Sequence, residues 1–342
     1  MLKRIPLEKA VGNVLPHDIT EIRPGEFKGP TFKKGHIITE EDIPHLKRLG
    51  KESIYVLELT EGYLHEDEAA MRLGKAFAGE NVSYDENPSE GKISFRAKIR
   101  GLLKVDVESL VEVNMVPEMC LSTLHNNTVV EESKIVASSR VIPLIVSEDI
   151  VQRAEEIALK KGGILTVKPF QRPKTGIIIT GNEVYYGLIE DKFKDKVIEK
   201  LNSYQVEVAK VIYCPDDKDK IVEAIRDLLE EGAGLLILCG GMSVDPDDVT
   251  RLGISEAGAE DMVYGTPILP GAMFLYARIK NVPVMGLPAC VIYYKNTIFD
   301  IMLPRVLIGE VIRRIDLAKL AHGGLCMNCK ECRFPVCPFG KG

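Results

Sequence analysis

The sequence predicts an α/β fold for residues 173–315, preceded by smaller β-rich α+β regions. Two observations carry this prediction. Short, wholly apolar segments recur at 176–180 and 235–238, as expected of strands that are buried on both faces. Between them, apolar residues fall at helical spacing in 193–201 and 221–229, the pattern of helices that cover a sheet with one face. This alternation indicates a parallel sheet with helices on both sides.

The composition is that of a globular protein of two or three domains. The 342 residues are 45% hydrophobic and 27% charged, and a domain takes roughly 100–200 residues. The net charge of −6 predicts no nucleic-acid and no membrane-surface partner, because both require positive charge. Charged residues interrupt the apolar stretch 299–312, which excludes it as a membrane span. Residues 1–12 lack the apolar core of a secretion signal, so we expect a cytoplasmic protein.

We expect four parts in the chain. They are a small β-rich N-terminal domain at 1–60, an α+β middle region at 61–172 with a β-rich part at 92–150, the α/β domain at 173–315 and a cysteine-rich tail at 316–342. The first part is predicted to contain a turn at 25–30, strands at 32–38 and 54–59, and a helix opened by Thr39 and Asp42 that ends near Gly50. The middle region is predicted to contain a helix at 67–77, a loop at 79–91, strands around 104–107, 134–137 and 142–146, and a helix from Ser147 to about Lys161.

Within the α/β domain, further elements follow the same alternation. Strands are predicted at 206–212 and 282–285, and a closing helix at 292–310 with a kink at Pro304. Ligands of an open parallel sheet bind outside the carboxyl ends of the strands. The residues that follow each predicted strand are therefore candidates for a site.

Three of these strand ends carry polar or glycine-rich sequences. They are Thr180-Gly181-Asn182-Glu183, Cys214-Pro215-Asp216-Asp217 and the segment 240–250, which opens with Gly240-Gly241 and includes Ser243, Asp247 and Asp248. Backbone amides can approach a ligand closely at the two glycines, and a helix expected after Pro246 would present free N–H groups, which together suit a phosphate. Asp216 and Asp248 would lie at the same edge, where carboxylates can hold Mg²⁺.

Each segment also has a simpler structural interpretation. A Gly-Gly pair after a strand can be only a tight turn. Asp216 or Asp217 can cap the following helix, and Asp247 and Asp248 can favour a helix start. The occurrence of all three segments at strand ends is what favours a site.

The motifs also occur in a familiar order. Along the chain they are Thr180-Gly181-Asn182-Glu183, Pro215-Asp216-Asp217, Gly240-Gly241-Met242-Ser243-Val244, Pro270-Gly271 and Gly286-Leu287-Pro288. In this series the segment 174–312 resembles the molybdopterin-binding domain of molybdopterin molybdotransferase and molybdopterin adenylyltransferase. The residues at 5–12 resemble the opening of the molybdotransferase more loosely.

The resemblance implies a three-layer α/β/α domain that binds a pterin dithiolene, molybdopterin, through its phosphate. Gly240, Gly241 and Ser243 would hold the phosphate by amide and hydroxyl donors. Asp216 and Asp248 match the acidic residues needed for Mg²⁺-dependent nucleotide chemistry, and they are the expected catalytic residues. The other matched residues are expected to bind the cofactor: Thr180, Gly181, Asn182, Glu183, Pro270, Gly271, Gly286, Leu287 and Pro288.

Three functions are consistent with this resemblance. The leading expectation is a transferase of molybdenum cofactor biosynthesis that moves a nucleotidyl group or molybdate to the pterin dithiolene, with ATP and molybdate as co-substrates. The competing expectation is a non-catalytic cofactor carrier, or an assembly factor for a molybdoenzyme or another protein of the cofactor pathway, with the cysteine tail as a redox sensor. The same domain occurs in competence-damage-type proteins, some of which resemble nucleotide pyrophosphatases. Because the resembling enzymes are oligomers, the resemblance also allows a homodimer.

Four cysteines crowd the end of the chain. Cys326, Cys329, Cys332 and Cys337 follow the spacing C-x2-C-x2-C-x4-C and precede Pro338. The run of bacterial ferredoxins is one residue shorter in its last gap, and a tetrahedral Zn²⁺ site is also compatible with four thiolates. We expect a metal site here, with an iron–sulfur cluster ahead of zinc. A free or disulfide-bonded tail is the remaining interpretation.

Overall fold

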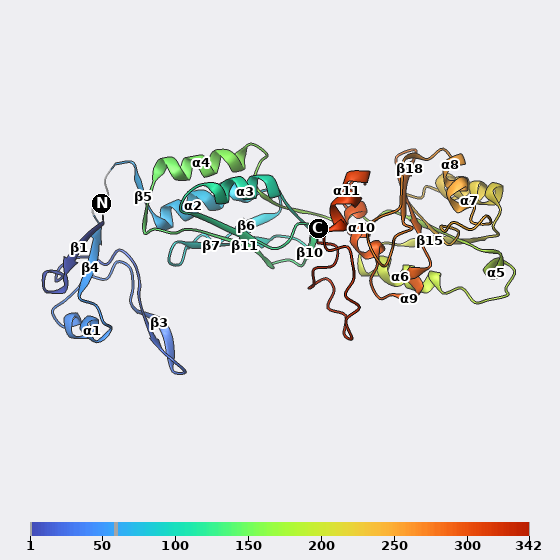
Figure 1. The fold of residues 1–342 in the computed structure, drawn as a ribbon. Coiled ribbons are helices and arrows are strands. Elements are labelled where there is room, and N and C mark those ends of the chain that lie inside the picture. The colour runs from blue at the N-terminus through green and yellow to red at the C-terminus, as the bar shows by residue number, and fades with distance from the viewer. Residues whose placement is uncertain (1, 58–60, 342) are drawn as a thin grey trace. The chain divides into compact units, whose positions relative to one another are not determined.

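The computed structural model describes residues 2–57 and 61–341. The end of the strand predicted at 54–59, at residues 58 and 59, lies outside the described residues, as do Met1 and Gly342. The chain divides into two compact units (Figure 1). The first comprises Met1–Asn126 with Val130–Val167, and the second comprises Lys168–Gly342 with Asn127–Val129.

The N-terminal part of the first unit has a small core of its own. Its elements are β1 (Leu2–Pro6), the 3-10 helix η1 (Leu7–Lys9), β2 (Ile19–Arg23), β3 (Phe27–Phe32), α1 (Asp42–Arg48) and β4 (Ser53–Leu57). β1 pairs antiparallel with β4, and β2 with β3. Leu7, Leu15 and Leu46 are buried between these elements.

The structure confirms the helix predicted for this part and corrects the bounds of its turn and its strand. Helix α1 forms, but its N-cap is Glu41 and no side chain caps it, although the Thr39 N–H donates to the Asp42 carboxylate at 2.8 Å. The turn predicted at 25–30 forms earlier, at 24–26, and the strand predicted around a turn at 32–38 is reduced to Phe32, a turn at 34–35 and a single bridge at Ile37. Pairing with β2 holds the chain extended from Phe27 to Phe32, so the strand lies earlier than the sequence suggested.

The rest of the first unit is an α+β arrangement around a larger core. Its elements are β5 (Tyr63–His65), α2 (Glu66–Phe77), β6 (Val82–Tyr84), β7 (Lys92–Ala97), β8 (Gly101–Val105), α3 (Val107–Met115), β9 (Met119–Thr123), β10 (Thr128–Val130), β11 (Ile135–Val141), β12 (Ile145–Ser147), α4 (Glu148–Leu159) and β13 (Leu165–Lys168). A four-stranded sheet has the order β6-β7-β11-β9, and α2 packs against α4. The predicted helices α2 and α4 are confirmed, whereas β6 lies inside the loop predicted at 79–91.

The second unit is built on a six-stranded sheet with the order β15-β14-β16-β19-β18-β17. Its elements are β14 (Thr175–Thr180), α5 (Asn182–Tyr185), α6 (Phe193–Ser203), β15 (Val208–Cys214), α7 (Lys218–Glu230), β16 (Leu235–Cys239), α8 (Thr250–Glu256), β17 (Glu260–Tyr264), β18 (Leu275–Ile279), β19 (Val282–Leu287), α9 (Cys290–Tyr293), α10 (Ile298–Leu307), α11 (Arg314–Ala318) and η2 (Lys319–Ala321). The four strands predicted from the sequence all form, and they run parallel to one another.

The expected parallel sheet is mixed, because β18 runs antiparallel to both of its neighbours, β19 and β17. β18 and β19 are joined by only two residues, Lys280 and Asn281, which both have positive φ values of 49° and 68°. A two-residue turn of this kind can join only antiparallel strands. The α/β class is confirmed, and the direction of this edge is corrected.

Successive side chains of the central strands point into two separate cores, which gives three layers. Ile177 and Ile179 of β14 lie in the core that includes residues of α6 and α10, whereas Ile178 lies in the core that includes residues of α7 and α8. The helices therefore cover both faces of the sheet (Figure 1). This is the three-layer α/β/α arrangement that the resemblance implied.

The single closing helix predicted at 292–310 is two helices, α9 and α10. Thr297 interrupts it: its side chain accepts a hydrogen bond from the Phe299 N–H at 3.2 Å, and the Asp300 carboxylate accepts one from the Thr297 N–H at 2.7 Å. This capping box starts a new helix, in which Pro304 is an interior residue. None of the helices in the described parts of the chain combines the length and the apolar composition of a membrane span.

Candidate ligand-binding edge of the sheet

The topology brings the predicted strand-end motifs to one edge of the sheet. β15, β14, β16 and β19 are neighbours and parallel, and they end at Cys214, Thr180, Cys239 and Leu287. β18 runs the other way and pairs Leu275 with Gly286, so the loop before it, which contains Pro270 and Gly271, reaches the same edge. All five motif segments therefore lie around the carboxyl ends of the parallel strands, where ligands of such sheets bind.

Asn182 and Asp216 connect two of these segments directly. The Asn182 N–H donates to Asp216 Oδ2 at 2.8 Å, and the Asp216 N–H donates to Asn182 Oδ1 at 3.1 Å. The Asp217 side chain has a different role. It accepts hydrogen bonds from the Asp219 and Lys220 N–H groups and caps α7. The capping role therefore belongs to Asp217, and the Asp216 carboxylate stays at the sheet edge.

The Gly240-Gly241 turn is packed too closely for any side chain. A Cβ atom on Gly240 would lie 2.5 Å from the Thr180 carbonyl oxygen, and one on Gly241 would lie 2.1 Å from Thr250 Oγ1. Both residues also have positive φ values, +93° and +59°. The turn therefore requires glycine at both positions, as expected of a backbone that a ligand or another chain segment approaches closely.

Thr180 lies beneath this turn and faces inward. Its hydroxyl donates to the Cys239 carbonyl at 3.2 Å and lies 2.9 Å from the Thr250 hydroxyl. Thr180 and Thr250 are 4% and 0% exposed. The Thr180 side chain thus holds β14 and β16 to the start of α8, and it is a support of the edge.

The loop between β16 and α8 is held by Arg251. Its guanidinium donates to the Ser243 carbonyl at 3.2 Å and lies 4.3 Å from the ring centroid of Tyr264. The Tyr264 hydroxyl donates to the Met242 carbonyl at 2.6 Å. The sequence analysis missed Arg251, although it is the only Lys or Arg between Glu231 and Arg278.

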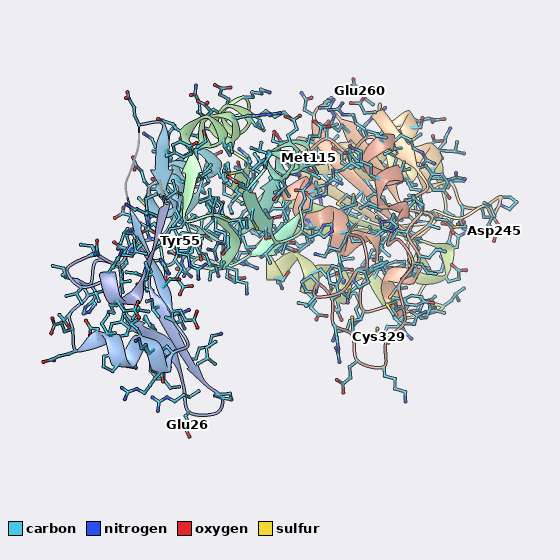
Figure 2. All side chains as sticks on the ribbon, turned by 60° about the vertical axis from the view of Figure 1, so that its left-hand side comes forward. Glu26, Tyr55, Met115, Asp245, Glu260 and Cys329 are labelled. Carbon is cyan, nitrogen blue, oxygen red and sulfur yellow. The ribbon has the colours of Figure 1, made fainter. Side chains whose placement is uncertain are left out.

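The helix expected directly after Pro246 begins later, at Thr250. The residues between them form a turn, in which the Asp248 N–H donates to the Asp245 carbonyl at 3.0 Å. Figure 2 shows Asp245 at the outer end of this loop, which projects from the unit. Neither Asp247 nor Asp248 makes a side-chain cap of α8, although both directly precede its N-cap, Val249.

Negative charge is concentrated around Asp216. Burial raises the pKa of the Asp216 carboxyl above its ordinary value, and the charges of Glu183, Asp248 and Asp247 raise this pKa further, against the effect of the Asn182 N–H. None of these four carboxylates forms an ion pair with a described residue. An excess of carboxylate oxygens at a strand end is the chemistry that attracts a hard cation such as Mg²⁺.

The segment Gly286-Leu287-Pro288 is buried. Leu287 is 0% exposed in the core, and its carbonyl accepts a hydrogen bond from the Gly240 N–H at 3.3 Å. On the other loop, the Pro270 carbonyl accepts a hydrogen bond from the Ile298 N–H at 3.3 Å. Through these hydrogen bonds, both segments support the edge of the sheet.

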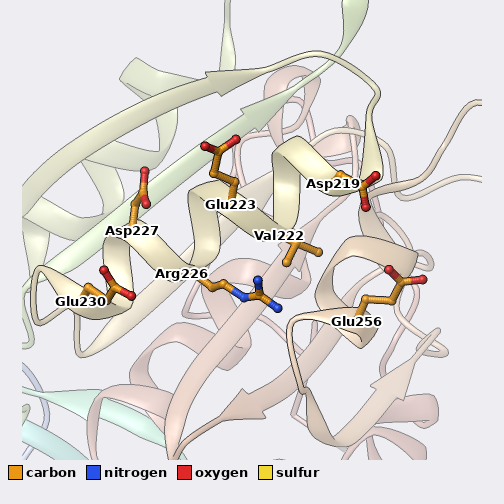
Figure 3. A pocket seen from close by; sticks show the side chains of 7 residues that line it. All are labelled: Asp219, Val222, Glu223, Arg226, Asp227, Glu230 and Glu256. Carbon is orange, nitrogen blue, oxygen red and sulfur yellow. The ribbon is translucent and has the colours of Figure 1, made fainter.

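A hollow of about 370 Å³ lies elsewhere in the second unit, on the outer face of α7 (Figure 3). Its lining is mainly acidic: Asp219, Val222, Glu223, Arg226, Asp227, Glu230 and Glu256. None of the predicted site residues lines it. Carboxylates of this number repel a phosphate group, so the hollow does not suit the predicted ligand.

The four cysteines of the tail line a different pocket, of about 240 Å³. All eight cysteines of the chain are free thiols. Among the described residues, no three His, Cys, Asp or Glu side chains are gathered closely enough to hold one metal ion. The structure therefore groups the four tail cysteines around one cavity.

Comparisons with known proteins match separate segments of the chain. A family described as "Domain of unknown function (DUF8806)" matches residues 4–58. A CinA-like protein of Mycobacterium sp. (strain JLS) is 28% identical over 95 residues, which are 28% of this chain and 23% of that protein. A CinA-like protein of Thermosipho melanesiensis is 34% identical over 91 residues, 27% of this chain and 22% of that protein. The matches thus span less than a quarter of the length of these curated relatives.

Two solved structures illustrate the range of similar proteins. The molybdopterin biosynthesis enzyme MoaB of Thermus thermophilus is 20% identical, covers 40% of this chain and 98% of its own, and has a TM-score of 0.35. The molybdopterin biosynthesis MoeA protein of Pyrococcus horikoshii is 15% identical, covers 90% of this chain and 76% of its own, and has a TM-score of 0.31. A family model matches residues 176–307, which contain the whole edge described above, and this segment belongs to the family described as "Probable molybdopterin binding domain".

Proposed function

We propose that the chain is a transferase of molybdenum cofactor biosynthesis that moves a nucleotidyl group from ATP to the phosphate of molybdopterin. The observation that carries the proposal is the meeting of Asn182, Asp216 and the Gly240-Gly241 turn at one sheet edge within a segment that matches the molybdopterin-binding family. In this reaction a phosphate oxygen of the pterin attacks the α-phosphorus of ATP, and pyrophosphate leaves.

The acidic residues of the edge fit a role in holding Mg²⁺. Asp216 and Asp248 would supply oxygen ligands. The pKa of Asp216 is raised by burial and by neighbouring acidic charge, and a cation would offset both. Bound Mg²⁺ neutralises the negative charge of phosphate groups during such a transfer. The backbone amide of Gly241 would orient the phosphate, whereas the Gly240 N–H already donates to the Leu287 carbonyl and supports the turn. Tyr264 and Arg251 hold the adjacent loop through the Met242 and Ser243 carbonyls.

Nucleotidyl transfer is preferred to molybdate insertion because of the residues beside Pro270 and Pro288. The molybdotransferase pattern that the segment resembles has lysines around Pro270-Gly271, whereas this chain has Leu269, Ala272 and Met273. It has Gly-Asn-Pro after Gly-Leu-Pro, whereas this chain has Ala289-Cys290-Val291. The positive charge that would attract molybdate is therefore missing from these loops.

The test is turnover by the purified full-length chain. With molybdopterin, ATP and Mg²⁺, we expect adenylated molybdopterin and pyrophosphate, detected by mass spectrometry and a pyrophosphate assay. Asp248→Asn should abolish this turnover and leave molybdopterin binding intact, and Asp219→Asn on the outer face of α7 is the matched control. Molybdopterin binding without any turnover would favour the carrier function, and release of metallated cofactor on addition of molybdate would favour molybdate insertion.

The match to CinA-like proteins favours one second candidate, a nucleotide pyrophosphatase. This activity would use the same carboxylates and Mg²⁺ to cleave a nucleotide phosphoanhydride with water as the acceptor. It differs from the transferase in needing no pterin. Mg²⁺-dependent release of a nucleoside monophosphate in the absence of molybdopterin would support it over nucleotidyl transfer.

A further inference from the structure

We propose that Cys326, Cys329, Cys332 and Cys337 bind a [4Fe–4S] cluster in the pocket that they line against the loop after α9. This inference does not depend on the proposed transfer reaction. It rests on how the tail is anchored, on the cavity between the cysteines and on one hydrogen bond to a cysteine sulfur.

The tail begins with a fixed attachment to the sheet domain. Leu325 forms a parallel bridge with Leu269. The Leu269 N–H donates to the Gly324 carbonyl at 2.8 Å, and the Cys326 N–H donates to the Leu269 carbonyl at 2.8 Å. The first cysteine is therefore held by backbone hydrogen bonds directly before Pro270, a residue of the candidate edge.

The end of the tail is fixed as well. The Gly340 N–H donates to the Gly323 carbonyl at 3.0 Å, which closes the segment into a loop. The Phe339 side chain is 4% exposed and belongs to the core on one face of the sheet. A Cβ atom on Gly340 would lie 2.3 Å from Ile301 Cδ1. The four cysteines thus belong to a closed loop whose two ends are packed on the domain.

All four cysteines line one cavity of about 240 Å³. Its other walls include Tyr294 and Asn296 from the loop after α9, and Phe334 and Phe339 from the tail itself. Cys329 and Cys332 are exposed, whereas Cys326 and Cys337 are half-buried. Figure 2 shows Cys329 on the tail at the surface of the unit. The cavity therefore has an open side through which iron and sulfide can enter and an inner side shielded by aromatic rings.

The size of the cavity favours an iron–sulfur cluster over a single zinc ion. Zn²⁺ in a four-cysteine site needs each sulfur at about 2.3 Å from one point, so four thiolates fill the space around it. Here all four cysteines line one cavity of about 240 Å³, far more space than a single ion takes. A four-iron cube with its own sulfide ions occupies such a volume and takes one thiolate at each iron.

Asn296 makes a contact that suits a cluster ligand. Its side-chain amide donates to Cys332 Sγ at 3.0 Å. Hydrogen bonds to the sulfurs of an iron–sulfur centre stabilise its more negative, reduced form and so raise its reduction potential. Asn296 is therefore a positioning residue that would tune the potential of the cluster through Cys332.

The experiment is anaerobic reconstitution of the full-length chain with ferrous iron and sulfide. We expect about four iron and four sulfide ions per chain, a broad visible absorption that dithionite bleaches, and an electron paramagnetic resonance signal of the reduced cluster. Cys332→Ser should lose most of this iron or change the signal, whereas Cys120→Ser, in β9 of the first unit, should leave both unchanged. One zinc ion per chain with four sulfur neighbours by X-ray absorption, or no bound metal at all, would overturn the proposal.

A second variant keeps the test independent of folding of the tail. Asn296→Leu retains all four cysteines, so it should bind the same amount of iron as the native chain. Its cluster should have a lower reduction potential, because the hydrogen bond to Cys332 is lost. An unchanged potential in this variant would contradict the placement of the cluster against Asn296. A melting curve recorded for each variant separates loss of metal from loss of fold.

Discussion

Asn182 and Asp216 are joined by two reciprocal hydrogen bonds across the ends of neighbouring parallel strands. Each backbone N–H donates to a side-chain oxygen of the other residue, at 2.8 and 3.1 Å. The pair uses only one oxygen of the Asp216 carboxylate, so the second oxygen is not engaged by it. Burial raises the pKa of the same carboxylate, and the charges of Glu183, Asp247 and Asp248 raise it further. Asp216 therefore fixes the loop and at the same time carries a charge that its surroundings disfavour.

Asp216→Asn should stabilise the free protein at neutral pH. A carboxyl whose pKa is raised on folding contributes stability below its unfolded value, about 3.8, and loses that contribution as the pH rises through its folded value. The neutral amide retains an acceptor for the Asn182 N–H and removes the repulsion. The melting temperature of the variant should exceed that of the native chain at pH 7, and the difference should vanish below about pH 3.8.

The same variant should respond differently to Mg²⁺. Addition of Mg²⁺ should raise the melting temperature of the native chain, because a ligand that binds only the folded state stabilises it. Asp216→Asn should lose most of this rise, whereas the exposed control Asp219→Asn should keep it. An equal effect of Mg²⁺ on all three proteins would contradict the assignment of Asp216 as a cation ligand.

The sequence predicted the central strands of the second unit well because burial on both faces leaves little choice of residue. β14 and β16 are wholly buried, and their apolar runs are visible without any structure. The outer strands were missed for the opposite reason: the first three residues of β17 are exposed at the sheet edge and carry no continuous apolar signal. The antiparallel direction of β18 follows from the turn at Lys280-Asn281, a local signal that could have been used.

Local capping also decided elements that apolar patterns predicted wrongly. The strand predicted around 104–107 is confirmed only up to Val105, the end of β8, because the Asp106 side chain accepts a hydrogen bond from the Ser109 N–H and starts α3. Thr297 and Asp300 divide the closing helix in the same way. At the candidate edge, the sequence indicated that Asp216 or Asp217 could cap the following helix, but it could not decide between them. Adjacent side chains leave a turn in different directions, and only the backbone of the turn determines which of them caps α7.

Gly241→Ala should destabilise the second unit strongly. The new methyl group would lie 2.1 Å from Thr250 Oγ1 in a backbone with φ of +59°, so steric overlap adds to the cost of the left-handed conformation. We expect a loss of about 3 kcal/mol or more in the free energy of unfolding, measured in urea. Gly232→Ala is the matched control, since its φ is +82° but nothing lies within 4 Å of the added Cβ. It should cost about 1–2 kcal/mol, and equal losses in the two variants would exclude a steric contribution at Gly241.

Thr250→Val tests the buried hydroxyl pair beneath the edge. Valine has nearly the same shape, but it removes the hydroxyl that lies 2.9 Å from Thr180 Oγ1. Loss of a buried hydrogen bond should lower the free energy of unfolding by about 1–2 kcal/mol. Thr266→Val is the matched control, because Thr266 is 8% exposed and its hydroxyl has no hydrogen-bond partner among the described residues. That variant should be neutral or more stable, and a similar loss in both would show that the hydroxyl pair contributes nothing specific.

Thiol labelling should separate the tail cysteines from those of the sheet. Burial raises the pKa of the Cys214 thiol to about 11 and also raises the pKa of Cys239, which is 0% exposed. Only thiolates react quickly with an alkylating reagent, so neither residue should be labelled at pH 7.5 in the native chain. Cys329 and Cys332 are exposed and should be labelled first, as mass spectrometry of the digested protein would show.

Reconstitution with iron and sulfide should then change this order. Thiolates bound to iron no longer attack the reagent, so the tail cysteines should be protected in the reconstituted chain, whereas Cys214 and Cys239 should stay unlabelled in both forms. Unfolding in guanidinium should expose all eight thiols, which provides the control for complete reaction. Rapid labelling of Cys239 in the native chain would contradict the packing of β16. Labelling of Cys329 and Cys332 at the same rate before and after reconstitution would show that iron binds outside the tail, because a cluster ligand cannot remain a free nucleophile.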